Sequence, residues 1–120
     1  MTQPEAFKLL ADIRAAVERE GGIFEDDVLA FDHAAPSDPL GFAFLSAHIV
    51  TIKFTGAVAA GVFLEKARAT LRRLLDRSDI RISLEIGGGK PAKFSLRVGI
   101  SKASAALRDL SATDDGGSAD

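Results

Sequence analysis

Apolar and polar residues alternate with a period of two in two stretches near the end of the chain. The first stretch, IRISLEI, spans residues 80–86, and the second, AKFSLRVGI, spans residues 92–100. The sequence between them, GGGKP, is typical of a tight turn. Alternation on both sides of a glycine-rich turn predicts a β-hairpin with one buried face and one exposed face.

A helical pattern precedes this hairpin. From Ala60 to Leu75 apolar residues recur every three or four positions, which predicts a long helix that continues to Arg77. Before it, HIVTIKF (residues 48–54) is rich in β-branched and aromatic residues and predicts a strand. Thr55 lies between the two segments and is a candidate N-cap of the helix.

The beginning of the chain predicts another helix. Thr2 and Glu5 have the spacing of a capping box, in which the threonine hydroxyl accepts the N–H of Glu5. Apolar residues at helical spacing follow, and Gly21 and Gly22 are expected to end the helix.

Three further segments carry weaker patterns. Residues 28–31 predict a short strand, and residues 32–39, DHAAPSDP, predict a loop because of their two prolines, Asp and Ser. Ser101 is a candidate N-cap for a short helix that ends near Leu110.

These elements predict an α+β fold. A β-α-β-β core with a terminal hairpin forms a sheet of three or four strands, packed on one long helix and accompanied by N- and C-terminal helices. Residues 1–110 are expected to form a single domain, because a chain of 120 residues is long enough for one hydrophobic core. The small, polar and acidic residues 111–120 are expected to be a disordered tail.

The apolar run of residues 40–64 has two interpretations. It is long enough to cross a membrane, for which about 20 apolar residues are needed. Lys53 lies near its centre, however, where a charge costs about 2.5–3.5 kcal/mol on insertion scales. The run also changes character near Thr55 and Gly56. A buried strand followed by a helix is therefore favoured, and conditional membrane insertion stays as the alternative.

Composition and charge narrow the function classes. The chain has no cysteine, which excludes disulfides and thiolate sites, and its beginning shows no signal peptide pattern, so a cytoplasmic protein is expected. Residues 1–40 hold nine acidic and three basic residues, a net charge of −6, whereas residues 41–110 hold five acidic and twelve basic residues, a net charge of +7. Such polarity is compatible with docking to a charged partner or with contact between the two parts of the chain.

The candidate partner-binding surface is a basic stripe on the long helix. Its residues are Lys66, Arg68, Arg72, Arg73 and Arg77. Neighbouring like charges destabilise a helix slightly, so an acidic protein partner, or this chain's own acidic N-terminal part, is a plausible counterpart. A merely solvated face is the simpler alternative. Nucleic acid is not expected, because the stripe lacks aromatic stacking residues and the whole chain is acidic. A homo-oligomer formed through a sheet edge is another possibility.

Catalytic and metal chemistry have few candidates. His33 is adjacent to Asp32 and close in sequence to Ser37 and Asp38, but neighbouring side chains do not by themselves form a catalytic triad. His48 lies on the same side of its predicted strand as apolar residues and is expected to be a core or interface histidine whose side chain has a backbone partner. No catalytic residue, metal site or cofactor is predicted, and the GGGKP turn lacks the spacing of a phosphate-binding loop.

The segment HIVTIKFTGAVAAGVFLEKARATLRRLLDRSDIRISLEIGGGKPAKFSL resembles the effector-associated constant component families of bacterial conflict systems. The resemblance covers about residues 45–110 and lies in the pattern of elements. It implies a non-catalytic adaptor or sensor that works beside an effector protein. Since that family has no catalytic motif to match, no functional residue is carried over. A non-enzymatic protein-interaction module is therefore the expected function, and a small enzyme using His33 or His48 is the less favoured one.

Overall fold

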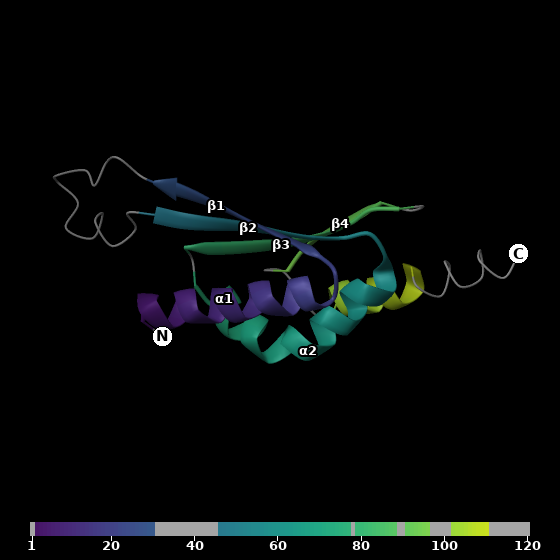
Figure 1. Cartoon of the computed structure of the whole chain (residues 1–120), viewed down its shortest axis with the longest axis horizontal. Helices are drawn as coiled ribbons and strands as arrows, with labels where there is room; N and C mark the ends of the chain where they lie inside the picture. The colour runs from purple at the N-terminus through teal and green to yellow at the C-terminus, as the bar shows by residue number, and fades with distance from the viewer. Residues whose placement is uncertain (1, 31–45, 78, 89–90, 97–101, 111–120) are drawn as a thin grey trace, which may run out of the picture.

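The sheet and the helices form two layers, with all helices on one face of the sheet (Figure 1). This computed structural model describes residues 2–30, 46–77, 79–88, 91–96 and 102–110. Within those residues the fold is α+β, with a four-stranded mixed sheet and three helices, as the sequence predicted.

The described residues form seven elements along the chain. They are α1 (Gln3–Arg19), β1 (Ile23–Ala30), β2 (Ser46–Phe54), α2 (Ala57–Leu75), β3 (Ile80–Ile86), β4 (Ala92–Ser95) and a last helix at residues 102–110. We call this last element the third helix.

The strand order is the order of the sequence, β1-β2-β3-β4. β1 and β2 are antiparallel, β2 and β3 are parallel, and β3 and β4 are antiparallel. Parallel neighbours need a crossover connection, and α2 provides it. The expected β-α-β unit is therefore present, and the expected hairpin extends it by one strand.

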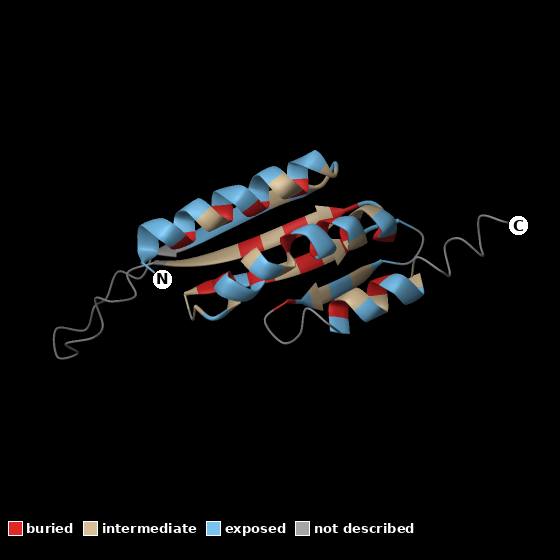
Figure 2. Ribbon diagram, turned by 90° about the horizontal axis from the view of Figure 1, so that it is seen from below, coloured by how far each residue is buried: buried red, intermediate tan, exposed pale blue. Residues whose placement is uncertain are grey.

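The core lies between the sheet and the helices (Figure 2). β3 alternates buried residues with exposed or half-buried ones, which confirms the predicted hairpin strand with two unlike faces. Phe63 of α2 is fully buried and its ring lies 5.5 Å from the ring of Phe54. The third helix contributes Ala103 and Leu107 to the same core. One hydrophobic core thus unites all seven elements.

Both ends of α1 follow the predicted capping. The hydroxyl of Thr2 accepts the N–H of Glu5 at 3.3 Å. At the other end Gly21 has a φ of 80°, a conformation that favours glycine, and the N–H of Gly22 donates to the carbonyl of Val17 at 2.9 Å.

β1 begins earlier than the sequence predicted. The expected strand covered residues 28–31, whereas β1 covers Ile23–Ala30 and includes three consecutive acids. Acidic residues disfavour a strand by propensity, but pairing with β2 along its whole length decides the structure here. Residue 31 and the predicted loop at residues 32–39 lie outside the described residues.

Two predicted limits of the long helix were wrong. The N-cap is Gly56, which makes no side-chain capping bond, and not Thr55. The helix ends at Leu75, two residues before Arg77. Arg77 instead binds Asp79 with two hydrogen bonds in the connection to β3, which competes with continuing the helix.

The second hairpin strand is shorter than the alternating pattern. β4 covers Ala92–Ser95, whereas residues 92–100 were expected to be a strand. Leu96 is already in a turn, where it is fully buried and its N–H donates to the carbonyl of Ile82 at 3.1 Å. Residues 97–101, with the predicted N-cap Ser101, and the acidic tail at residues 111–120 lie outside the described part.

Candidate functional site

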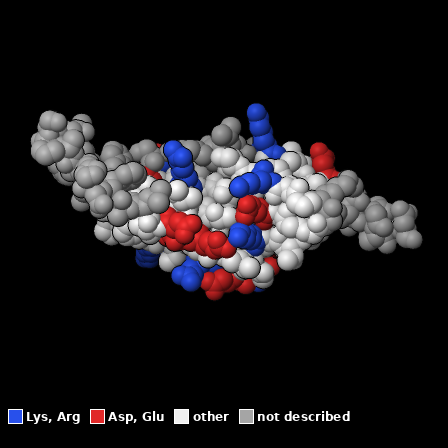
Figure 3. All heavy atoms as spheres, turned by 90° about the horizontal axis from the view of Figure 1, so that it is seen from above, with Lys and Arg blue, Asp and Glu red and all other residues white. Residues whose placement is uncertain are grey.

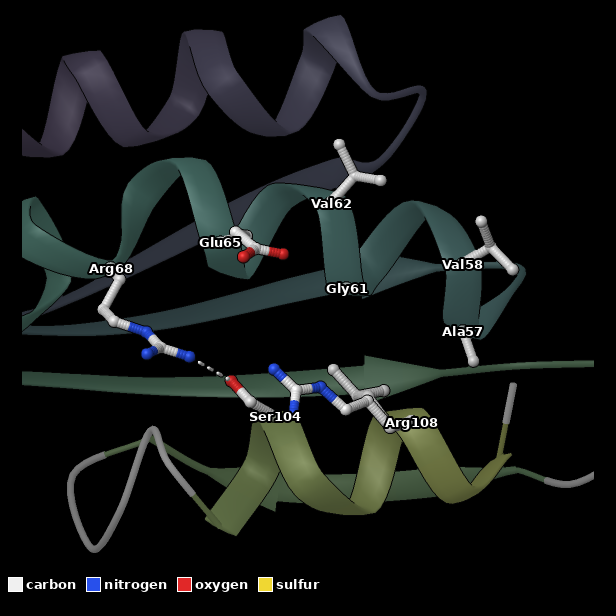
Figure 4. A pocket seen from close by; sticks show the side chains of 9 residues that line it. Ala57, Val58, Gly61, Val62, Glu65, Arg68, Ser104 and Arg108 are labelled. Atoms are coloured by element: carbon white, nitrogen blue, oxygen red, sulfur yellow. Dashed lines mark hydrogen bonds between the residues drawn. The ribbon is translucent and has the colours of Figure 1, made fainter. Parts of the chain in front are cut away.

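The basic residues of α2 do not form one stripe. Successive residues of an α-helix are about 100° apart, so Lys66 and Arg68 lie on opposite sides of α2. Lys66 approaches α1, where its Nζ lies 3.4 Å from Oε1 of Glu20. Arg68 approaches the third helix, where its Nη2 donates to Oγ of Ser104 at 3.2 Å (Figure 4). The structure therefore uses these two residues to hold neighbouring helices.

Arg77 lies beyond the end of α2 and is also engaged. Its Nε and Nη2 donate to the two carboxylate oxygens of Asp79, each at 2.9 Å. These hydrogen bonds lower the pKa of the Asp79 carboxyl and raise that of the Arg77 guanidinium. Both side chains are largely buried, so this pair fixes the turn between α2 and β3 rather than presenting a free charge.

Arg72 and Arg73 are the two members of the predicted set that remain available. Both are exposed, and neither forms an ion pair or a side-chain hydrogen bond with any residue in the described ranges. Their charges lie on the outer side of the last turns of α2. Of the five basic residues, these two fit best the role of binding a partner.

A pocket of about 210 Å³ separates α2 from the third helix (Figure 4). Gly61 and Val58 of α2 line it on one side, and Leu107 and Arg108 line it on the other. The guanidinium of Arg68 crosses its end, and the buried Nε atom of Arg68 has no hydrogen-bond partner. The pocket thus combines apolar walls with the cationic groups of Arg68 and Arg108 and the carboxylate of Glu65.

The outer side of α2 beside this pocket carries two exposed valines. Val58 is 60% exposed and Val62 is 38% exposed. They are four residues apart and therefore adjacent on the helix surface. Together with Arg72 and Arg73, and with the exposed acids Glu65 and Asp76 on the same side of the helix, they define what we call the α2 outer surface.

His48 lies at a different place, between α1 and the sheet. Its Nδ1 is 3.0 Å from Oδ2 of Asp26, and its ring is 5.1 Å from the ring of Phe7. Its backbone N–H donates to the carbonyl of Asp79 at 2.8 Å. The imidazole of His48 is therefore paired with a carboxylate of β1, whereas the sequence predicted a backbone partner for it; the bond to Asp79 is made by the main-chain N–H alone.

Lys53 points away from the helices. It lies on the open face of the sheet, where basic and acidic side chains lie next to one another (Figure 3). Its Nζ lies 2.8 Å from Oε1 of Glu25, and this hydrogen-bonded pair raises the pKa of the Lys53 ammonium. Glu85 of β3 adds a further attraction and itself pairs with Lys93 at 3.3 Å. The charge in the middle of the apolar run is thus compatible with a central strand, because it faces solvent and carboxylates.

No family model, curated protein or solved structure gives a significant match to this chain. The resemblance of residues 45–110 to a component of bacterial conflict systems therefore stays a prediction.

Within the described residues 46–64 the apolar run is divided between two elements, and its first part, residues 40–45, lies outside the described residues. Residues 46–54 belong to β2, a central strand, and the first turns of α2 follow. Among the described residues, no helix has the length and apolar character needed to cross a membrane. Insertion of this run would remove Ile52, Phe54 and Phe63 from the core.

The catalytic and metal-site candidates of the sequence are the last to be placed. His33, Asp32, Ser37 and Asp38 lie outside the described residues. In the ranges that are described, no group of three or more His, Asp or Glu side chains has the arrangement of a metal site.

Sequence reasoning missed the α2 outer surface and the acidic partner of His48. Val58 belongs to an apolar run in which every residue could be buried. Which of these residues stay exposed depends on where the third helix packs. A helical projection would have separated Lys66 from Arg68. No local signal would have paired Asp26 with His48, because they are 22 positions apart.

Proposed function

We propose that this chain is a non-enzymatic protein-interaction module that binds an acidic partner protein through the α2 outer surface. The observation that carries the proposal is the presence of two exposed valines and two unpaired arginines on the same solvent-facing side of one helix. Such a surface offers both apolar contact and charge attraction.

The apolar part supplies the contact area. Single exposed apolar residues are common on protein surfaces, whereas contiguous apolar patches rimmed by polar residues mark interaction sites. Val58 and Val62 lie at the rim of the pocket that Leu107 helps to line. A partner side chain that enters this pocket would cover both valines and be shielded from water.

The charged part supplies orientation. Arg72 lies ten residues after Val62, which corresponds to about 15 Å along the helix axis. A complementary partner surface therefore has apolar residues at one end and carboxylates about 15 Å away. Long-range attraction by Arg72 and Arg73 would accelerate association and fix the direction of binding.

The biological setting follows from the resemblance in the sequence. A small, non-catalytic domain of this pattern would act as an adaptor or sensor component of a bacterial effector or defence system. The α2 outer surface would then bind the effector or another component of the same system.

Pull-down from the native host, followed by binding measurements on the recovered protein, tests the proposal. We expect the double variant Arg72→Glu, Arg73→Glu to lose the partner while its melting temperature stays within about 2 °C of the wild type, because exposed charges contribute little to stability. Val58→Ser is expected to weaken the same complex. Lys8→Glu, which reverses an exposed charge on α1, is the matched control and should bind normally. Equal binding by the wild type and the double variant would refute the role of the two arginines.

A further inference from the structure

β1 is an edge strand of the sheet. It pairs with β2 on one side, and no strand in the described part of the chain pairs with its other side. Alternate backbone N–H and C=O groups of an edge strand point away from the sheet and can bond a further strand. β1 has eight residues, which is long enough for such pairing.

The side chains of β1 are accessible on both faces of the sheet. A strand that is covered on one face has alternating buried and exposed side chains. In β1, by contrast, four consecutive residues are all exposed: Glu25, Asp26, Asp27 and Val28. Val28 is 55% exposed although it points to the helix side, where its pairing partner His48 is largely buried. α1 therefore leaves the outer edge of β1 open.

A second pocket lies beside this edge, between α1 and the sheet. A helical projection places three of its lining residues on one side of α1, namely Phe7, Ala11 and Arg14. Glu20, at the end of α1, is on the opposite side, where it contacts Lys66 of α2. The pocket is therefore on the side of α1 that faces away from α2. Its volume is about 220 Å³. It is lined by Phe7, Leu10, Ala11, Arg14, Phe24, Asp26 and His48.

The lining of this pocket suits one apolar side chain. The rings of Phe7 and Phe24 and the side chain of Leu10 supply apolar contacts. A cavity of roughly 150 Å³ can hold a benzene molecule in a protein interior, so this volume is sufficient for an aliphatic or aromatic side chain. A strand paired with β1 would direct every second side chain toward the helix side, where the pocket lies.

Charge decides which strand fits. Glu25 and Asp27 point to the open face, and Asp26 between them points to the helix side. If two copies of β1 paired symmetrically about Asp26, Asp26 would face its own equivalent and Glu25 would face Asp27. Like charges directly opposite each other are destabilising in a sheet. In that register the edge disfavours a second copy of itself, and its three consecutive acids favour a basic segment.

We propose that β1 binds an extended, basic segment of a partner protein as a fifth strand. Basic residues of that segment lie opposite Glu25 and Asp27 on the open face, and the apolar residue between them enters the pocket beside Asp26. Recognition combines main-chain pairing with one side-chain pocket, as in other cases of strand addition. This surface is on the opposite side of the molecule's helical layer from the third helix, and its use does not depend on the function proposed for α2.

A short synthetic peptide provides the first test. The probe alternates lysine with leucine, is blocked at both ends and carries a fluorescent label, and the full chain is titrated into it. We expect saturable binding that is abolished when every lysine is replaced by glutamate. Asp27→Lys should weaken binding about tenfold. The variant loses one exposed ion pair between Asp27 and a lysine of the peptide, and it gains a repulsion of similar size between two lysines. Asp76→Lys, directly after the end of α2, is the matched control and should bind as the wild type does.

Two further measurements separate strand addition from simple charge attraction. N-methylation of every second residue of the peptide removes the backbone N–H donors on one edge of the bound strand and leaves those on the other edge. Methylation of the residues that face β1 should therefore abolish binding, and methylation of the other residues should preserve it. Ala11→Phe fills the pocket and should reduce binding without changing the net charge. Equal binding of both methylated peptides, or full binding by Ala11→Phe, would overturn the proposal. Dimerisation of the free chain that is strengthened by Asp27→Lys would do so as well, because the new lysine would then face Glu25 of a second copy on this edge.

Discussion

The Nδ1 atom of His48 lies 3.0 Å from a carboxylate oxygen of Asp26, its diagonal neighbour across β1 and β2. The ring of Phe7 covers the imidazole, so α1 and two strands meet at this pair. His48→Ala should lower the free energy of unfolding by about 1–3 kcal/mol, since a partly buried hydrogen bond and a ring contact are lost. Urea denaturation measures this difference.

The matched control for that pair is the adjacent carboxylate. Asp26→Asn should cost about 1 kcal/mol, because it weakens the bond to His48. Asp27→Asn, on the opposite face of the same strand, should stay within about 0.5 kcal/mol of the wild type. If both asparagine variants unfold at the same urea concentration, the pair contributes nothing to stability.

Asp79 makes stability depend on pH in the acid range. The guanidinium of Arg77 lowers the pKa of the Asp79 carboxyl in the folded protein, so the ionised form stabilises the fold. This contribution is complete above the unfolded pKa of about 4 and is lost as the pH falls through the lower, folded pKa. Asp79→Asn should therefore cost about 1.5–3 kcal/mol at neutral pH, the range for hydrogen bonds to charged groups.

The same variant should also change the shape of the pH profile. The difference in unfolding free energy between the wild type and Asp79→Asn should shrink as the pH is lowered below about 4, because the wild type then loses the same interaction. Thermal or urea unfolding at a series of pH values measures it. A difference that is constant down to the lowest pH would contradict the assignment of the lowered pKa to Arg77.

Gly22 and Gly61 should respond in opposite ways to substitution by alanine. A Cβ at Gly22 would lie 2.6 Å from the ring of Phe54 and 2.8 Å from Val17, in the packed core between α1 and the sheet. Gly22→Ala should therefore cost about 1–3 kcal/mol by overpacking. A Cβ at Gly61 meets nothing within 4 Å, and Gly61 is inside α2. Gly61→Ala should stabilise the protein by roughly 0.8–1 kcal/mol. Melting curves of the two variants should show a lower melting temperature for Gly22→Ala and a higher one for Gly61→Ala than for the wild type.

Lys53 should stabilise the sheet in a manner that depends on salt. It pairs with Glu25 and is attracted by Glu85 and Asp27, so Lys53→Glu places a fourth acid among three others. We expect the variant to melt at a lower temperature than the wild type, with a difference that narrows as salt is raised from about 10 mM to about 1 M, because the Debye length falls from about 30 Å to about 3 Å. Lys8→Glu on α1 serves as the comparison, and an equal salt response in both variants would argue against the cluster.

The order of elements was already determined by local sequence. Period-two alternation in residues 80–86 and helical spacing up to Leu75 depend only on neighbouring positions, and these segments formed as predicted. Their limits were less well predicted. The helix ends before Arg77 because Arg77 binds Asp79, and β1 extends over three acids because β2 pairs with all of it.

The placement of charge on the surface was decided only by the tertiary structure. Lys66 and Arg68 are two positions apart in the sequence, yet one contacts α1 and the other the third helix, since a helix turns by about 200° between them. Which neighbour occupies each side depends on how distant elements pack. The sequence gives the types of residue on the candidate surfaces, but it does not give their surroundings. Packing alone determined that Val58 stays exposed and that Asp26 contacts His48.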